Sequence, residues 1–271
     1  MSAALLSTVI IVAAALVFIG LERWRPYDTR QKFLRDEFWS DLLLYTLVQS
    51  YVLGIAITKV IEGLDAGTGL SRLHLVTAWP IWLQFTFFFV THDLYIYIFH
   101  RAQHRFKWLW RLHEAHHSTK DVDWLSGSRS HPLEILVNQT IEFAPLVLLG
   151  AHPLVAILKL TVDAVWGMYI HTNIDVRSGA LQYVVNGPEM HRWHHAKEIS
   201  DGHLNYGTKL AIWDWLLGTA YLPKNKKPEA YGMFGYDVPR GYLAQVLFAF
   251  RRRKMITPFS VSRVSATQPA P

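Results

Sequence analysis

The feature that most restricts the fold of this chain is an uncharged apolar stretch at the amino end, residues 3–20. A helix of about 20 residues crosses the hydrocarbon core of a bilayer, which is roughly 30 Å thick. A cleaved signal peptide would instead place basic residues before the apolar run. No Lys or Arg precedes this stretch, and Glu22, Arg23 and Arg25 follow it directly. We therefore expect a retained transmembrane helix.

Further apolar stretches follow at residues 41–61, 79–99, 133–150 and 153–170. The last two are separated only by Ala151 and His152, so we expect a hairpin whose arms need not cross the membrane fully. With 51% hydrophobic residues, this pattern predicts an all-α integral membrane bundle of four to five membrane helices. We expect a single domain over residues 1–254, with residues 255–271 as a loose tail.

Basic residues are distributed unevenly among the connecting segments. Residues 21–40 hold five and residues 101–131 hold six Lys or Arg, whereas residues 63–78 hold only Arg72. Because basic residues are enriched in cytoplasmic loops, these two segments and the chain after residue 171 should be cytoplasmic, at a bacterial inner membrane or the endoplasmic reticulum. The membrane then explains the net charge of +6, and no nucleic-acid partner is expected.

A short apolar segment near the carboxyl end, residues 242–250, is followed by the basic run Arg251 to Lys254. This pattern fits an interfacial helix on anionic lipid. A solvated charge run fits it equally well, and the sequence leaves both interpretations open.

Histidines are concentrated in one part of the chain, since thirteen of the fourteen lie between His92 and His203. Eight of these histidines form one HxxxH group and two copies of HxxHH. Helix positions i, i+3 and i+4 share one face, so each group can direct its imidazoles into one region. These eight imidazoles exceed the capacity of one ion, which predicts two ions. The expected ligands are His100, His104, His113, His116, His117, His191, His194 and His195.

The HxxxH group and the first HxxHH should lie on separate helices, because one unbroken helix would point His100 and His113 in different directions. Together with the second HxxHH they predict a cytoplasmic helical cap that holds the metal site. His171 and His131 are additional ligand candidates, whereas the roles of His92 and His203 stay open.

The chain has no cysteine, so nitrogen and oxygen atoms must hold any metal. One alternative function is an intramembrane zinc metalloprotease, because His113-Glu114-x-x-His117 has the zinc-protease pattern with Glu as general base. Against it, Arg192 replaces that Glu in the second copy, and a protease has no use for a third ligand group. A second alternative is a non-enzymatic membrane metal-binding or transport protein, which would distribute its ligands along a transmembrane path.

The order of these motifs resembles the fatty acid hydroxylase superfamily, which includes sterol desaturases, sterol methyl oxidases and sphingolipid fatty acid hydroxylases. The resemblance covers about residues 85–222. It rests on the three histidine groups and on the strings His131-Pro-Leu-Glu134, His171-Thr-Asn173, Asn205-Tyr-Gly207 and Ile212-Trp-Asp214 to Gly218-Thr219. It implies that the eight histidines above are the family's histidine boxes and that His171 is the extra histidine before the last box.

The resemblance also implies two iron ions, for which zinc can substitute in isolated protein, and a reaction with O2 and two electrons. The expected activity is hydroxylation or desaturation of a sterol, fatty acyl or related lipid in the bilayer. A separate reductase, ferredoxin-like or cytochrome-like protein would supply the electrons. Because ligand imidazoles usually donate their second N–H to an acceptor, polar residues near the boxes are candidate second partners. These are Asp93, Glu114, Asn173, Asp175 and Asn205.

Overall fold

The computed structural model describes residues 1–199, 204–233 and 235–251. In this part of the chain the regular elements are helices, which confirms the all-α prediction, and strand pairing is limited to isolated bridges. The longer helices are α1 (Ala3–Trp24), η1 (Ser40–Gln49), α2 (Ser50–Thr68), α3 (Ile81–Arg105), α4 (Lys107–His117), α5 (Pro132–Leu148) and α6 (Pro153–His171). The shorter ones are η2 (Leu70–Leu73), η3 (Ser126–Ser128), η4 (Gly179–Tyr183), α7 (Pro188–His194), η5 (Lys197–Ile199), α8 (Ile212–Leu216) and α9 (Tyr242–Phe248).

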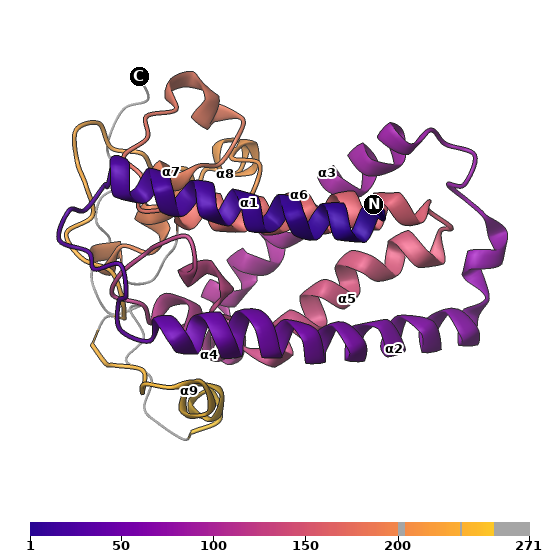
Figure 1. Ribbon diagram of the computed structural model, residues 1–271, viewed down its shortest axis with the longest axis horizontal. Helices are drawn as coiled ribbons and strands as arrows, with labels where there is room; N and C mark the ends of the chain where they lie inside the picture. Colours follow the sequence, from indigo (N-terminus) through magenta and orange to yellow (C-terminus); the bar gives the residue numbers. More distant parts are fainter. Residues whose placement is uncertain (200–203, 234, 252–271) are drawn as a thin grey trace.

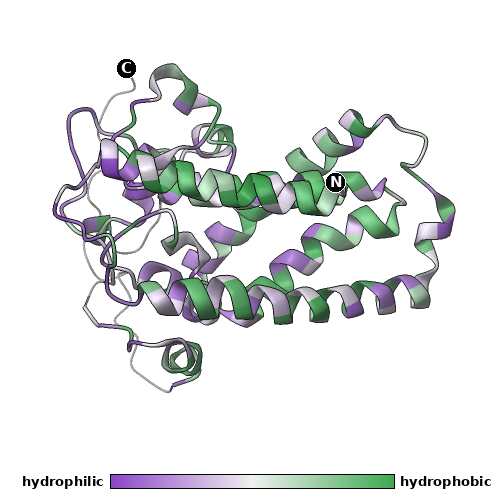
Figure 2. Ribbon diagram, viewed as in Figure 1, coloured by the Kyte–Doolittle hydropathy of each residue, from purple (hydrophilic) through white to green (hydrophobic). Residues whose placement is uncertain are grey.

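The long helices α1, α2, α5 and α6 extend along the long axis of the molecule, and the short helices α7, α8 and α9 gather at one end (Figure 1). Helix α1 packs against α6, α2 packs against α5, and α3 contacts both α4 and α6. Apolar residues dominate the long helices, whereas polar residues dominate the end with the short helices (Figure 2). The molecule therefore has an apolar bundle and a polar cap.

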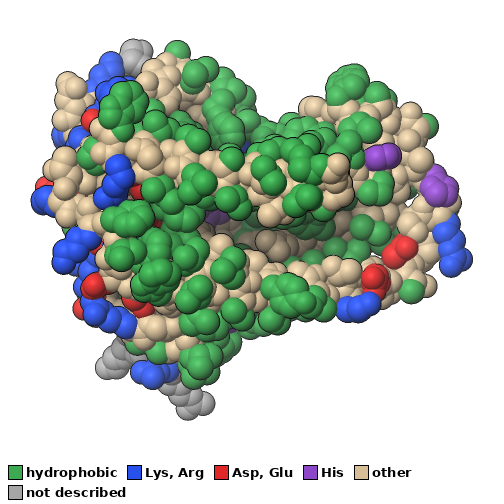
Figure 3. Space-filling view, viewed as in Figure 1, with side chains coloured by type: hydrophobic (Ala, Val, Ile, Leu, Met, Phe, Trp, Pro, Cys, Tyr) green, Lys and Arg blue, Asp and Glu red, His purple; other side chains and the backbone are tan. Residues whose placement is uncertain are grey.

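Three helical segments of the described chain are long and apolar enough to cross a membrane: Ala3–Trp24, Ser40–Thr68 and Pro153–His171. This is fewer than the four to five that the sequence suggested. Helix α3 is long enough, but it includes His92, Asp93 and several further polar residues, and α5 has only 17 residues. Apolar side chains cover much of the outer surface of the bundle (Figure 3), as expected for a surface in contact with lipid.

The predicted hairpin is formed by α5 and α6, and both helices begin with the same tripeptide, His-Pro-Leu. Nδ1 of His131 accepts a hydrogen bond from the backbone N–H of Leu133 at 3.1 Å, and Nδ1 of His152 does the same for Leu154 at 3.1 Å. Each imidazole thus caps a helix whose first residue is proline.

A single residue separates the two helices that carry the first two histidine groups. Phe106 has extended backbone (φ −106°, ψ 119°), and it ends α3 one residue before α4 begins. This break turns the chain, so that His100 and His104 at the end of α3 approach His113 on α4. The prediction that the two groups lie on separate helices is therefore confirmed.

Candidate metal centre

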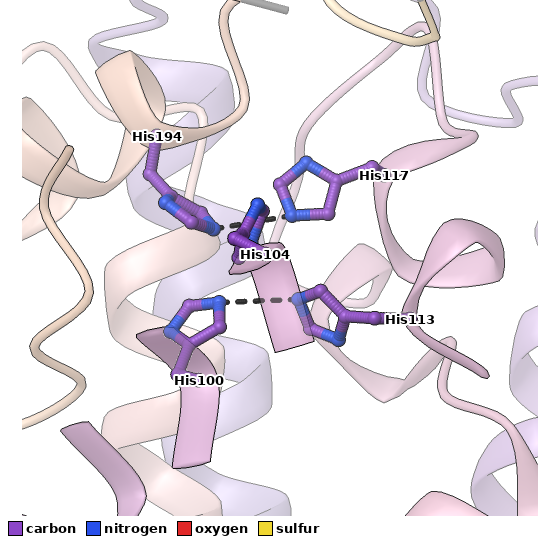
Figure 4. A group of neighbouring side chains, drawn as sticks. All are labelled: His100, His104, His113, His117 and His194. Carbon is purple, nitrogen blue, oxygen red and sulfur yellow. Dashed lines mark hydrogen bonds between the residues drawn. The ribbon is translucent and has the colours of Figure 1, made fainter. Parts of the chain in front are cut away.

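Nine of the predicted ligands meet where α3, α4, α6 and α7 converge, and they form two groups. Within each group, one nitrogen of every ring lies within 4.8 Å of the others. We call the first the five-histidine group, shown in Figure 4, and the second the four-histidine group. The five-histidine group comprises His100, His104, His113, His117 and His194. The four-histidine group comprises His116, His171, His191 and His195.

Each HxxHH motif contributes to both groups. On α4, His113 and His117 belong to the five-histidine group and His116 to the other. The second motif does the reverse, because His191 and His195 belong to the four-histidine group and His194 to the five-histidine group. The motif therefore works as an i, i+4 pair for one group and a single ring for the other, which holds the two groups side by side.

Backbone carbonyls and one carboxylate fix the orientation of five of these rings. Nδ1 of His100 donates to the carbonyl of Tyr206 at 2.8 Å, and Nδ1 of His194 donates to that of Leu204 at 2.8 Å. Because a carbonyl oxygen only accepts, each Nδ1 must carry the hydrogen. The remaining three donate to the Glu134 carboxylate (His113, 3.0 Å), the Arg129 carbonyl (His116, 3.2 Å) and the Gly167 carbonyl (His171, 2.7 Å).

The Nε2 atoms of these rings consequently have only lone pairs to offer, and they face one another. Nε2 of His100 lies 3.1 Å from Nε2 of His113, and Nε2 of His116 lies 3.3 Å from Nε2 of His171. Two facing lone pairs at this distance repel unless a cation lies between them. The five-histidine group, with the His100–His113 and His117–His194 contacts drawn as dashed lines, is seen in Figure 4.

Protonation does not relieve this repulsion, because the rings are buried. Burial lowers the pKa of His194 to about 3 and lowers the pKa of His116 and His117 well below the ordinary value. The same effect lowers the pKa of His191 and His195, with neighbouring imidazoles adding to it. Lowered pKa values favour the neutral form of these five rings near pH 7, which is the form that binds metal ions.

The dimensions of each group also suit one ion. Ligand nitrogens at about 2.1 Å from an ion lie at most roughly 4.2 Å apart, close to the spread of each group. The groups differ in their second contacts, because Nδ1 of His191 and Nδ1 of His195 are buried without a hydrogen-bond partner among the described residues. Packing must therefore orient these two rings of the four-histidine group.

Gly127 in η3 permits the close packing of the His171 ring. A Cβ atom at this position would lie 2.6 Å from Nδ1 of His171, closer than side chains tolerate. A larger residue would therefore displace one ligand of the four-histidine group. No motif in the sequence marked this glycine.

His131 belongs to neither group, which corrects its inclusion among the candidate ligands. Its Nδ1 accepts the capping hydrogen bond from Leu133, and its Nε2 lies 3.2 Å from the carbonyl of Val246. Both ring nitrogens are therefore committed to backbone groups. The repeated His-Pro-Leu tripeptide was the sequence signal for this capping role.

The five predicted second partners of the imidazoles have other contacts in the structure. Asp93 accepts hydrogen bonds from the backbone of Lys209 and Leu210 and from Trp213, while Glu114 accepts one from the Tyr236 hydroxyl at 2.7 Å. The other three fasten loops. Asn173 bonds to the backbone of Asp28, Asp175 lies 3.4 Å from Arg177, and Asn205 donates to the carbonyls of Met190 and Tyr221.

A different carboxylate, Asp214, acts through the backbone that holds two of the rings. The segment 204–207 supplies the acceptors for His194 and His100, and Asp214 fixes it by accepting from the N–H groups of Tyr206 and Gly207 at 2.8 and 2.7 Å. In the described part of the chain, the carboxylate of Glu134, in the first turn of α5, accepts a hydrogen bond from an imidazole of these groups. Sequence reasoning placed Glu134 in a family string but gave it no role.

His92, which had no predicted role, lies in a separate buried cluster. The Lys159 ammonium lies 2.8 Å from Nδ1 of His92, 2.7 Å from Glu142 and 2.8 Å from Asp163. His92, Glu142 and Asp163 lie close enough to ligate an ion, but Lys159 already supplies the cation. His203 lies outside the described residues.

Comparison with known proteins agrees with this site. The family model described as fatty acid hydroxylase matches residues 85–219. An ornithine lipid hydroxylase of Rhizobium tropici is 32% identical over 255 residues, which cover 92% of this chain and 75% of that enzyme. This chain belongs to the fatty acid hydroxylase family. Because it covers 92% of this chain, the match to the bacterial enzyme extends well beyond the histidine region.

Two animal members of the family match over a shorter range. Human alkylglycerol monooxygenase is 32% identical over 145 residues, covering 54% of this chain and 32% of that enzyme. Rat methylsterol monooxygenase 1 is 28% identical over 145 residues, covering 51% of this chain and 48% of that enzyme. No solved structure shows significant similarity to the chain. Membership of this family supports an oxidoreductase that acts on lipids, in preference to a protease or a transporter.

Proposed function

We propose that this protein is a membrane lipid hydroxylase that holds two iron ions, one in each histidine group. The observation that supports the proposal most directly is the set of converging Nε2 lone pairs, whose orientation is fixed by acceptors behind the rings. Imidazole ligands suit iron, zinc, copper and nickel. Among these, iron fits a family whose relatives are named hydroxylases and monooxygenases.

The chemistry that such an iron pair supplies is the activation of O2 and the cleavage of an unactivated C–H bond. Overall, a lipid C–H bond, O2, two electrons and two protons would give a lipid alcohol and water. We favour hydroxylation over desaturation because the similar proteins are hydroxylases and monooxygenases by name. Two electrons must come from a separate redox protein, of the ferredoxin, cytochrome or reductase class.

The protein's own residues have two tasks in this reaction. Glu134 and the carbonyls of Tyr206 and Leu204 hold the rings in the tautomer that presents Nε2. Aromatic rings exclude water from the site: the Trp110 ring lies 4.8 Å from His104, and the Tyr206 ring lies 5.7 Å from His100.

The proposed substrate is a polar membrane lipid, and ornithine lipid is the first to assay because the bacterial relative matches nearly the whole chain. The histidine groups lie at the end of the bundle near Trp24 and Ser40 rather than near η2. We propose that this end faces the cytoplasm, in agreement with the basic residues of segments 21–40 and 101–131.

Lipid analysis under isotopically labelled O2 tests this function. Membranes that contain ornithine lipid would be compared with and without the protein, together with a His194→Ala variant. We expect a new lipid that contains one labelled oxygen atom, formed only with the intact protein. A product that lacks two hydrogens and carries no label would show desaturation, and no O2-dependent product from any membrane lipid would contradict the proposal.

A further inference from the structure

We propose that α9 is an interfacial helix that rests on the bilayer with Leu243, Leu247 and Phe250 in contact with lipid. Leu243 and Leu247 lie at i and i+4 on one side of α9, and Phe250 lies in the turn that follows the helix. They are 70%, 60% and 59% exposed. This is a large apolar surface for a seven-residue helix, and it requires a partner that is itself apolar.

The opposite side of α9 is fastened to the protein by polar contacts. The Tyr45 hydroxyl donates to the side-chain oxygen of Gln245 at 2.7 Å, and the Tyr242 hydroxyl donates to that of Gln49 at 2.9 Å. Gln245 is buried and also donates to Glu37. The helix therefore turns its polar side inward and its leucines outward, the reverse of a helix on a water-soluble domain.

The position of α9 identifies the partner as lipid. Tyr45 and Gln49 belong to η1, which forms the first part of the candidate membrane span Ser40–Thr68. Leu44 and Val48 of the same segment are exposed, so the apolar side of α9 continues the surface that this span presents to lipid. In Figure 1, α9 is seen end-on while α1 and α2 run along the page, as expected for a helix that lies across the spans in the membrane plane.

Aromatic and basic residues at the same level support this placement. Trp39 immediately precedes η1 and Trp108 lies on α4, which contacts α9; both indoles are exposed. Tryptophan is enriched at the boundary between lipid and water. Arg251 follows α9 and is exposed, where anionic headgroups would attract it.

His131 links this helix to the metal centre. Its Nε2 lies 3.2 Å from the carbonyl of Val246, and it caps α5, the helix from which Glu134 accepts the hydrogen bond of His113. The imidazole that sequence reasoning assigned to the metal thus positions α9 instead.

Depth measurements on single cysteine labels test the proposal, since the chain contains no cysteine of its own. Leu247→Cys would be spin-labelled in full-length protein in vesicles of phosphatidylethanolamine and phosphatidylglycerol. Collisions of the label with O2, which prefers lipid, would be compared with collisions with a water-soluble nickel complex. Val52→Cys on α2 serves as the lipid reference, and Lys226→Cys on an exposed loop serves as the water reference.

We expect the Leu247 label to resemble the Val52 label, with a ratio of O2 to nickel collisions several-fold above that of the Lys226 label. A ratio equal to that of Lys226 would overturn the proposal. Spectral broadening that disappears on dilution with unlabelled protein would also overturn it, because a second copy of the chain would then cover α9.

His131→Asn tests the link, because asparagine also caps helices well but is too short to reach Val246. We expect this variant to retain its metal while the Leu247 label becomes more mobile. Loss of metal, or an unchanged label, would show that His131 does not act through α9. None of these measurements depends on lipid hydroxylation, so they distinguish failure of this inference from failure of the proposed function.

Discussion

The bundle buries two polar clusters that share α3 and α5. They differ in how their charges and lone pairs are balanced. In the cluster around Lys159, the ammonium is matched by Glu142 and Asp163, and Lys209 lies 3.0 Å from the other oxygen of Asp163. In the histidine centre, nine imidazoles face one another, and within the described residues the carboxylate of Glu134 accepts a hydrogen bond from one of them. In the first cluster the lysine ammonium groups balance the carboxylates, whereas we propose that the second cluster binds cations from outside.

This difference explains why the cluster of His92, Glu142 and Asp163 is not a third metal site although its atoms are close together. A buried ammonium at the centre repels an incoming cation, and removing one partner of a buried ion pair is costly. The direction of the ligand lone pairs is therefore a better indicator of a metal site than the burial of residues that can bind metal.

The largest effect should follow from removing one ligand. His116→Ala leaves the four-histidine group with three rings, so we expect the metal content to fall by about half. Second contacts alone contribute about 10–100-fold to metal affinity or activity, so the loss of a ligand should reduce hydroxylation by more than about a hundredfold. His74→Asn is the control, because His74 is exposed near η2. Full metal content in His116→Ala would contradict the assignment.

The next largest effect concerns the ionic cluster. Lys159→Met leaves Glu142 buried without its cation and leaves Asp163 paired with Lys209, and we expect the free energy of unfolding to fall by about 3–5 kcal/mol. The folded fraction in detergent should nevertheless retain its metal. The double variant Lys159→Met/Glu142→Gln removes part of the unpaired charge and should regain part of the stability. Metal loss without destabilisation would show that the cluster belongs to the metal centre.

A smaller effect is expected from the one carboxylate behind the rings. Glu134→Gln removes the charge that holds His113, so the metal affinity of the five-histidine group should fall by about 10–100-fold. Competition with a chelator measures this change. Glu142→Gln is the matched control, because it alters the same residue type on the same helix but in the other cluster. Equal effects of both substitutions would remove the distinction between the clusters.

The smallest effect should come from crowding one ring. Gly127→Ala would place a Cβ atom against His171, and such overpacking costs about 1–3 kcal/mol. We expect faster loss of metal from the four-histidine group in a chelator time course. Gly167→Ala keeps the carbonyl that His171 uses and has open space for its Cβ. If both variants release metal at the same rate, the packing argument is wrong.

The sequence predicts well which histidines come together, because the spacing within each motif is local. His100 and His104, or His113 and His117, are brought together by the helix itself. The partners behind the rings are different, because Tyr206 reaches His100 across 106 residues and Glu134 reaches His113 across 21. Such contacts depend on how α3, α4 and α5 pack, so they cannot be predicted from the spacing of residues in the sequence.

The same distinction applies to His131 and Asp93, whose contacts in the structure differ from those that the sequence suggested. His131 lies in a string of the family, yet its repeated tripeptide with His152 is a local capping signal that favours structure over ligation. Asp93 lies two turns before His100 on the same helix, and the sequence suggested it as a hydrogen-bond acceptor for an imidazole. It instead accepts hydrogen bonds from the backbone of residues 209 and 210, which directly follow the segment 204–207 that holds two of the rings. The motifs therefore indicated that both residues have a role near the site, but not which groups their side chains contact.

Metal analysis of active, full-length protein tests the central claim most directly. The orientation of the imidazoles predicts two metal ions per chain, iron in the active form, with activity lost on chelation and regained when iron is restored. Full activity in protein free of metal, or a third ion that survives the loss of both histidine groups, would contradict the account.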